Sequence, residues 1–459
     1  MSEQTVEKKV KKPLSPTQII VASFLLVITV GGLLLCLPLS SRSGEFTPFL
    51  DALFTATSAT CVTGLIVVDT YLHFSFFGQL VILCLIQIGG LGLITFVTFF
   101  SVAVGKKMRF KNMSLAQESI SAPSVSGLPH LVRMVVKASL LIEGCGTLLL
   151  CLSFIPRYGF LQGLWTAFFL AVSAFCNAGF DILGHEGAYS SLIHYTGDPI
   201  VIGTISALIV IGGLGFLVWA DLYGLRHTKK LRLHTKIVLF ITALLILLGT
   251  LLFCVLEWNN PSTMGPLSVP EKLGAGLFQS ISCRTAGFNS IDLNAMSGFT
   301  KLVASILMFI GAGPASTGGG IKVTTFAVIV MTILSFSSGR ENTVILKRRI
   351  DHKTVYKALT ISALALVVVF ITSSVMFYSI PRSTFNTPIN AIFEACSAFG
   401  TVGLSDGLTG EGNALTHIIT MLTMFIGRVG PASLAISLAS GRGGRKKNQV
   451  MPEGKVLVG

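Results

Sequence analysis

The chain is poor in charged residues. Asp, Glu, Lys and Arg together make up 12% of the 459 residues, whereas hydrophobic residues make up 52%. Average soluble domains carry about 25% charged residues. This composition excludes an ordinary soluble enzyme or binding module and predicts an all-α polytopic membrane protein.

Motifs for metal binding, redox chemistry and nucleotide binding are also missing from the sequence. The nine cysteines form no CxxC pair, the histidines form no HExxH pair, and no GxGxxG follows a predicted strand. We therefore expect no enzymatic activity and no covalently bound cofactor. Cysteines near the repeated signature described below, such as Cys61, Cys176 and Cys283, are interpreted as small packing residues rather than metal ligands.

Long hydrophobic runs, in contrast, are abundant. Eight of them reach the roughly 20 residues needed to cross a bilayer, near Thr17–Leu37, Phe76–Val104, Leu131–Ile155, Ile200–Leu222, Ile237–Leu256, Lys301–Phe336, Val355–Ile380 and Ala414–Leu438. Shorter runs are more typical of re-entrant helices, near 47–58, 162–173, 269–281 and 387–398.

A short signature occurs four times, each time directly after one of the shorter runs. The first copy reads Ser58-Ala-Thr-Cys-Val-Thr-Gly64-Leu65, and every copy ends in glycine followed by a large apolar residue. The other three glycines are Gly179, Gly287 and Gly403, so that successive glycines are 115, 108 and 116 residues apart. Such a period in a hydrophobic chain predicts four equivalent membrane units around one pore.

The positive charge lies between these units and at the ends of the chain. Basic clusters occupy 8–12, 106–111, 226–236, 347–349 and 442–447, and the segments that carry the signatures are more acidic. This placement argues against nucleic acid as a partner. By the positive-inside rule it puts both termini and the inter-unit loops in the cytoplasm, so all four units have the same orientation.

The predicted fold is therefore four parallel repeats of helix, re-entrant pore helix and helix (M1-P-M2). It contains eight transmembrane helices plus four re-entrant pore helices around one pore. The repeats occupy 17–111, 112–230, 231–350 and 351–440, between cytoplasmic tails at 1–16 and 441–459.

The repeated signature has the properties of a cation selectivity filter. A dehydrated cation can be held by rings of backbone carbonyls, one loop from each of four repeats. Glycine permits the positive φ that such a loop needs, and the preceding short helix points its negative end at the ion. Glycine-mediated helix packing would explain one copy, but four aligned copies favour a filter. We assign cation binding to the backbone carbonyls of Val62, Thr63, Gly64, Asn177, Ala178, Gly179, Thr285, Ala286, Gly287, Thr401, Val402 and Gly403.

With these motifs the chain resembles the Trk/Ktr/HKT superfamily of potassium transporters, and within it the bacterial KtrB type of membrane subunit. The resemblance runs from about Pro13 to Gly459 and is most specific at 58–65, 283–289 and 397–404. Some plant HKT members have serine in place of the first filter glycine and favour sodium. Because this chain has Gly64, the resemblance implies selectivity for K⁺.

The run Lys301–Phe336 is too long for one crossing and contains a glycine-rich segment at 311–322. Pro314 and five glycines cannot maintain a regular helix, so we expect two half-helices joined by an intramembrane loop. A phosphate-binding P-loop does not fit the spacing, and a flexible link without a role in conduction is the alternative. In the resembling family this loop is a gate, which implies gating roles for Gly311, Ala312, Gly313, Pro314, Ala315, Ser316, Thr317, Gly318, Gly319, Gly320 and Lys322.

Two further charged residues lie inside predicted spans. Arg428 is interpreted as a positive charge that lines the pore below the filter and helps the loop to close it, with snorkelling to the interface as the alternative. Glu143 is interpreted as a structural partner of a neighbouring helix rather than a proton relay. Glycines near Gly90, Gly213, Gly313 and Gly427 recur below each filter segment and suit either a hinge or close helix packing.

The resemblance also implies partners and cargo. We expect a homodimer in the bacterial plasma membrane, K⁺ as substrate, and Na⁺ as a coupling or activating ion. Because the chain lacks a nucleotide-binding domain, a cytosolic KtrA-like nucleotide-binding ring is expected to regulate it. A broken-helix secondary transporter for a small solute is the alternative function, but it predicts inverted rather than parallel repeats.

Overall fold

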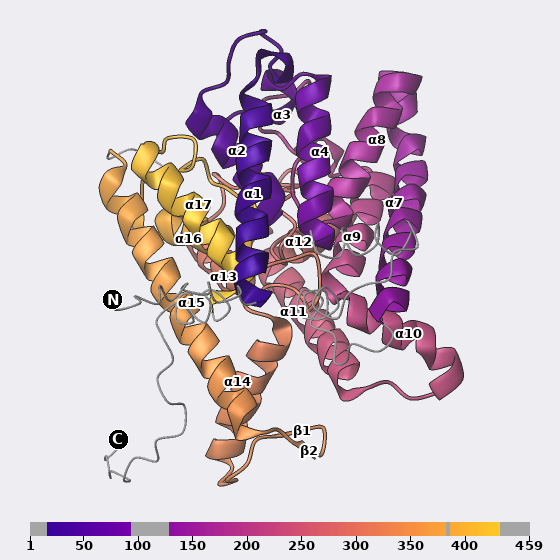
Figure 1. The fold of residues 1–459 in the computed structure, drawn as a ribbon, viewed down its shortest axis with the longest axis vertical. Helices are drawn as coiled ribbons and strands as arrows, with labels where there is room; N and C mark the ends of the chain where they lie inside the picture. Colours follow the sequence, from indigo (N-terminus) through magenta and orange to yellow (C-terminus); the bar gives the residue numbers. More distant parts are fainter. Residues whose placement is uncertain (1–15, 93–127, 382–385, 432–459) are drawn as a thin grey trace, which may run out of the picture.

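The computed structural model describes residues 16–92, 128–381 and 386–431, and the statements below concern these residues. This part of the chain is mostly helical (Figure 1). Its one small sheet pairs β1 (Val344–Ile345) with β2 (Arg348–Arg349) in antiparallel register. The predicted C-terminal tail, nearly all of the N-terminal tail and the basic clusters at 8–12, 106–111 and 442–447 lie outside the described residues.

A long helix followed by two shorter helices recurs four times along the described chain. The long helices are α1 (Pro16–Cys36), α7 (Leu128–Tyr158), α11 (Leu233–Glu257) and α15 (His352–Ser379). The next helices are α2 (Phe49–Cys61), α8 (Phe160–Phe175), α12 (Val269–Ser282) and α16 (Pro388–Gly400). The third helices are α4 (Phe76–Leu91), α9 (Pro199–Leu214), α13 (Gly298–Phe309) and α17 (Ala414–Val429).

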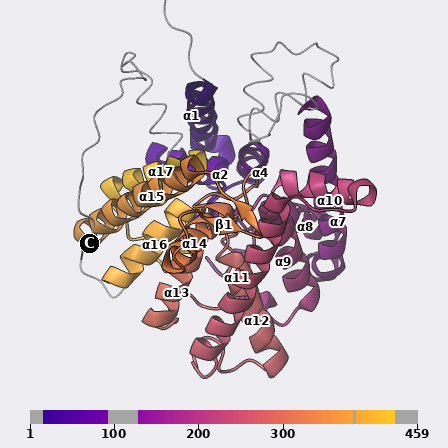
Figure 2. The ribbon, with the colours of Figure 1, turned by 90° about the horizontal axis from the view of Figure 1, so that it is seen from below.

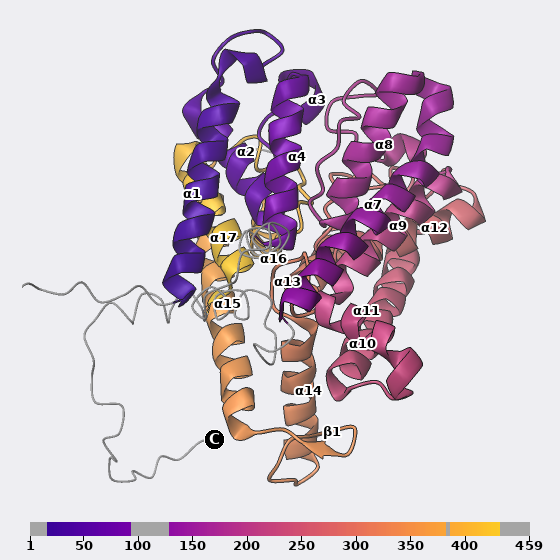
Figure 3. The ribbon, with the colours of Figure 1, turned by 45° about the vertical axis from the view of Figure 1, so that its right-hand side comes forward.

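These groups follow one another around the molecule. Seen from below, α1 and α4 lie at the top, α7, α8 and α9 at the right, α11 and α12 at the bottom, and α15 and α16 at the left (Figure 2). The remaining elements are α3 (Thr70–His73), α10 (Phe216–Thr228), α14 (Val323–Ser337) and two 3₁₀ turns at Pro38–Ser40 and Ile193–Tyr195. Helix α14, the small sheet and the lower part of α15 extend below the other described elements (Figure 3).

Four helices of the described residues are long and apolar enough to cross a membrane. They cover Gln18–Cys36, Leu131–Tyr158, Leu233–Glu257 and His352–Ser379, close to four of the predicted spans. The third helix of each group has 12 to 16 residues. At 1.5 Å per residue such a helix is about 18–24 Å long, shorter than the roughly 30 Å hydrocarbon core.

The straight span expected near Ile200–Leu222 is wrong, because the chain bends by 93° between α9 and α10. The bend is at Gly215, whose φ of 97° a residue with a side chain rarely adopts. A Cβ on Gly215 would collide with the carbonyl oxygen of Pro314. Beside it, the Phe216 amide donates to the carbonyl of Ala315 at 2.7 Å. The bend thus fits the chain against the glycine-rich segment.

The predicted break in the run Lys301–Phe336 is confirmed. Helix α13 ends at Phe309 and α14 begins at Val323, with an irregular segment between them. The amide of Gly311 donates to Ile321 O at 2.8 Å, so the two ends of this segment lie side by side. We refer to residues 311–322 as the central loop.

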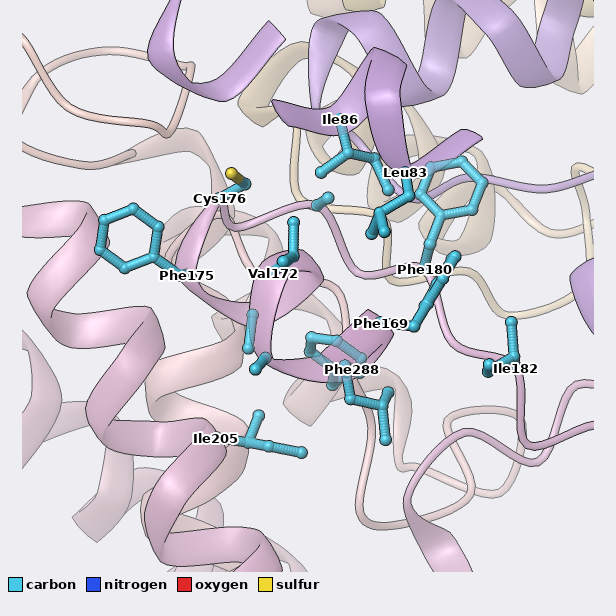
Figure 4. Packing of buried hydrophobic residues seen from close by; sticks show 14 of the residues in the cluster. Leu83, Ile86, Phe169, Val172, Phe175, Cys176, Phe180, Ile182, Ile205 and Phe288 are labelled. Carbon is cyan, nitrogen blue, oxygen red and sulfur yellow. The ribbon is translucent and has the colours of Figure 1, made fainter. Parts of the chain in front are cut away.

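The hydrophobic core encloses the short helices. Phe169, Val172 and Phe175 of α8 pack with Leu83 and Ile86 of α4, with Ile205 of α9 and with Phe288 (Figure 4). Cys176 belongs to the same cluster and is fully buried, as expected of a packing residue. All nine cysteines are free thiols, and the described residues contain no group of three metal-ligating side chains.

Candidate functional site

The four signature segments share an unusual backbone conformation. The residue two positions before each glycine has a positive φ: 57° at Val62, 59° at Asn177, 75° at Thr285 and 48° at Thr401. The glycines themselves are also in the left-handed half of φ space, at 90°, 70°, 81° and 97° in chain order. Residues with side chains adopt this region at a cost, so its occurrence at four equivalent positions indicates a constraint common to all four segments.

The four glycines lie in a closed ring. A Cβ added to Gly64 would lie 3.1 Å from the Cα of Gly179, and one on Gly179 would lie 2.9 Å from the Cα of Gly287. A Cβ added to Gly287 would lie 3.2 Å from the Cα of Gly403, and one on Gly403 would lie 2.9 Å from the Cα of Gly64. The structure therefore brings the four predicted filter glycines together, each backbone against the next.

Each signature segment is tied back to the short helix before it. Thr63, Ala178 and Val402 donate their amides to the carbonyls of a serine five residues earlier, at 2.8–2.9 Å. The third segment differs, since Ala286 donates to Ser282, only four residues earlier, at 3.0 Å. This is the copy whose sequence has no serine at the first position. All eight non-glycine residues of the predicted filter are fully buried.

An open cavity of about 450 Å³ adjoins the ring of glycines. Gly64, Gly287 and Gly403 contribute to its floor, and Asp181 and Asp292 to its walls. Burial raises the pKa of Asp181 to about 7, and the negative charge of the nearby Asp69 acts in the same direction. The cavity therefore combines acidic groups with access to the signature glycines.

The central loop contacts the signature segments. A Cβ on Gly318 would meet the side chain of Thr285, and one on Gly319 would meet that of Thr401. The Thr317 hydroxyl donates to the carbonyl of Phe175 at 3.3 Å. Three of the four signature regions thus contact the loop directly.

Two partly buried cationic side chains donate to carbonyls of the central loop. Arg428 of α17 donates to the carbonyl of Thr317, and also to Gly89 O and Gly90 O at the end of α4. Lys322 Nζ donates to Gly318 O at 2.7 Å within the loop itself. Because no salt bridge of the described residues involves Arg428, its guanidinium is held by carbonyls alone.

Arg284 is a third cation beside the loop, directly before Thr285 in the chain. It is 7% exposed and donates to Thr242 O at 3.2 Å and to Gly311 O at 3.5 Å. The other three copies have Cys61, Cys176 and Gly400 at the corresponding position, so Arg284 is unique to the third copy. Its contacts link a filter segment to the start of the central loop.

Glycines on the third helices permit close packing. A Cβ on Gly89, Gly212 or Gly427 would collide with the last carbonyls of α2, α8 or α16, respectively. These contacts support the close-packing interpretation. Glu143 is also structural, as expected, because Gln87 of α4 donates to both of its carboxylate oxygens at 3.0 and 3.2 Å.

The sequence did not reveal a buried ion pair beside the fourth segment. Lys301 of α13 donates to Asp406 at 3.1 Å, with both side chains at most 6% exposed, and to Asn390 of α16 at 3.1 Å. Glu394 of α16 accepts from the hydroxyl of Thr409 at 2.7 Å in the same loop. A lysine within an apolar run was the available signal, since such a residue needs a partner.

The comparisons with known proteins agree with this fold. The family model for TrkH, cation transport protein, matches residues 6–442. The chain is 41% identical to the Ktr system potassium uptake protein B of Bacillus subtilis over 97% of both chains. It is 39% identical to the potassium/sodium uptake protein NtpJ of Enterococcus hirae over 99% of both. In structure it is similar to the potassium transporter TrkH from Vibrio parahaemolyticus, with a TM-score of 0.71, 16% identity, and coverage of 95% of this chain and 87% of that one.

The fold and the site together define a class of protein, namely a polytopic helical membrane protein with four equivalent glycine loops. The chain belongs to the TrkH/Ktr family of cation transport proteins, as its motifs predicted. It is therefore a transporter and not an enzyme.

Proposed function

We propose that this protein carries K⁺ across the bacterial plasma membrane through a filter formed by the four signature segments. The closed ring of Gly64, Gly179, Gly287 and Gly403 is the observation that carries the proposal. Paired positive φ values in each segment suit carbonyls that line a narrow passage. The buried hydroxyls of Thr63 and Thr401, which have no hydrogen-bond partner in the described part of the chain, suit contact with water or a cation.

The order of one long and two shorter helices in each group supports four parallel M1-P-M2 repeats around this filter. Both termini would then face the cytoplasm and the cavity with Asp181 would face outward. Its acidic walls would raise the local concentration of cations before they reach the filter.

The central loop is proposed to be the gate. It closes the inner side of the filter through Gly318 and Gly319, and Arg428 holds it through Thr317. An arginine in this place also repels a cation, so the same residue opposes conduction by charge and by hydrogen bonding. Opening requires that these bonds break.

The relatives named as Ktr system proteins support a membrane subunit that acts with further components. We infer a homodimer regulated by a cytosolic KtrA-like nucleotide-binding ring. The name of the relative NtpJ supports Na⁺ as a second ion in this family, here as a coupling or activating ion. A solute transporter with broken helices is less favoured, because it predicts inverted repeats, whereas the four groups share the order of one long and two shorter helices.

Growth of a potassium-uptake-deficient strain on low K⁺ tests the proposal. Wild type should restore growth and Gly287→Ala should not, because its Cβ would collide with Val402 O. Gly298→Ala is the matched control, since its Cβ would have no heavy atom within 4 Å. Restored growth with Gly287→Ala at equal protein levels would contradict a filter at this position.

A further inference from the structure

A groove between α4, α7 and α8 has no part in the proposed ion pathway. It consists of two cavities, one of about 690 Å³ lined by residues such as Phe76 and Trp165, and one of about 400 Å³ lined by residues such as Leu83 and Leu140. Phe168 of α8 lines both, so the two adjoin along the same helices.

The groove follows α4 from its first residue to its last. Phe76 borders the first cavity and Leu91 borders the second. A helix of 16 residues is about 24 Å long, and one leaflet contributes about 15 Å of hydrocarbon. The groove is therefore long enough to accommodate an acyl chain over the full depth of a leaflet.

Arg42 lies at the end of the groove next to Phe76. Its guanidinium lies 4.0 Å from the centre of the Tyr71 ring, and Nε donates to Phe74 O at 3.2 Å. Among the described residues, no salt bridge includes Arg42 and no hydrogen bond involves its Nη groups. A guanidinium fixed through Nε with its Nη groups available suits a phosphate oxygen.

The second cavity of the groove is lined mainly by apolar side chains, which suit a lipid tail. Glu143 borders it, but its carboxylate is satisfied by Gln87. Gly144 borders it too, and a Cβ there would have no heavy atom within 4 Å. The open space at this depth is thus free of unsatisfied polar groups.

We propose that this groove binds one anionic phospholipid, with its phosphate on Arg42 and an acyl chain between α4, α7 and α8. A single cation at the rim above a long apolar groove corresponds to the layout of a phospholipid. The bound lipid would link the first and second groups of helices. The proposal does not depend on the filter or the gate, so its failure would leave them unaffected.

Native mass spectrometry of the full-length protein, titrated with phosphatidylglycerol or phosphatidylethanolamine, tests this site. We expect one phosphatidylglycerol to be retained by wild type and to bind about tenfold more weakly to Arg42→Gln, since a hydrogen bond to a charged group is lost. Lys272→Gln is the matched control, because Lys272 also lies over an aromatic ring, that of Trp258, away from the groove.

A second pair of variants tests the tail. Gly144→Leu should fill the groove and weaken retention of phosphatidylglycerol, whereas Gly203→Leu, equally free of contacts, should not. Equal retention by wild type and Arg42→Gln, or equal binding of both lipids, would overturn the proposal. So would a Gly144→Leu protein that loses its dimer but retains the lipid, because the groove would then be an interface between copies.

Discussion

Removal of the Arg428 side chain is the perturbation with the clearest expected effect on flux. Its guanidinium joins the central loop, at Thr317, to the end of α4, at Gly89 and Gly90. Arg428→Ala deletes this link and the positive charge below the filter together. Both changes favour the open loop, so ion flux should rise.

The magnitude follows from the hydrogen bond that Arg428 donates to Thr317 of the loop. A hydrogen bond from a charged donor contributes about 1.5–3 kcal/mol. Loss of about 2 kcal/mol from the closed state raises the ratio of open to closed loops about 30-fold. Arg428→Lys keeps the charge and one donor, and should therefore give a smaller increase.

Uptake of K⁺ into cells that lack other potassium systems, normalised to protein in the membrane, measures this effect. Arg232→Ala is the control, because Arg232 is an exposed arginine whose ion-pair partner, Asp221, is outside the central loop, and its removal should leave flux unchanged. Flux in Arg428→Ala at or below the wild-type level would refute the gating role.

Three other variants test separate features. In Lys301→Met the buried carboxylate of Asp406 loses its cationic partner, which should destabilise the protein by about 3 kcal/mol. The double variant with Asp406→Leu has no unpaired carboxylate, so the single variant should have the lower Tm of the two. Asp181 should be neutral below pH 7 and negative above it, so K⁺ uptake at low K⁺ should rise from pH 6 to pH 8, and Asp181→Asn should abolish this rise. Arg284→Gln should raise flux by only a few-fold, since the contact of Arg284 with Gly311 is long at 3.5 Å; unchanged flux would separate Arg284 from the gate.

Features of the fold that depend on composition were predictable from the sequence. Apolar length located the long helices, and Pro314 with its neighbouring glycines located the break between α13 and α14. The bend at Gly215 was missed, because a single glycine in an apolar run is also compatible with a straight helix. What bends the chain there is a tertiary contact, the bond from Phe216 to Ala315 on the central loop.

The candidate site was predictable where the residues repeat and not where they are unique. Four equivalent glycines such as Gly64 could be aligned with one another, and the structure brings them together. Arg284 and the pair formed by Lys301 and Asp406 occur once each. Arg284 lies 42 residues from Thr242 in sequence and Lys301 lies 105 residues from Asp406, with no pattern to connect them. Only folding determines which carbonyl or carboxylate a buried cation meets.

Selective uptake through the ring of glycines is the central claim, and a comparison of K⁺ and Na⁺ uptake tests it most directly. A Cβ at Gly64 would lie 2.5 Å from Ala178 O, and φ there is 90°, so Gly64→Ser must distort the first and second segments. In cells without other potassium systems, wild type should take up K⁺ in strong preference to Na⁺, and Gly64→Ser should lose that preference. Equal uptake of the two ions by the wild-type protein would contradict the account.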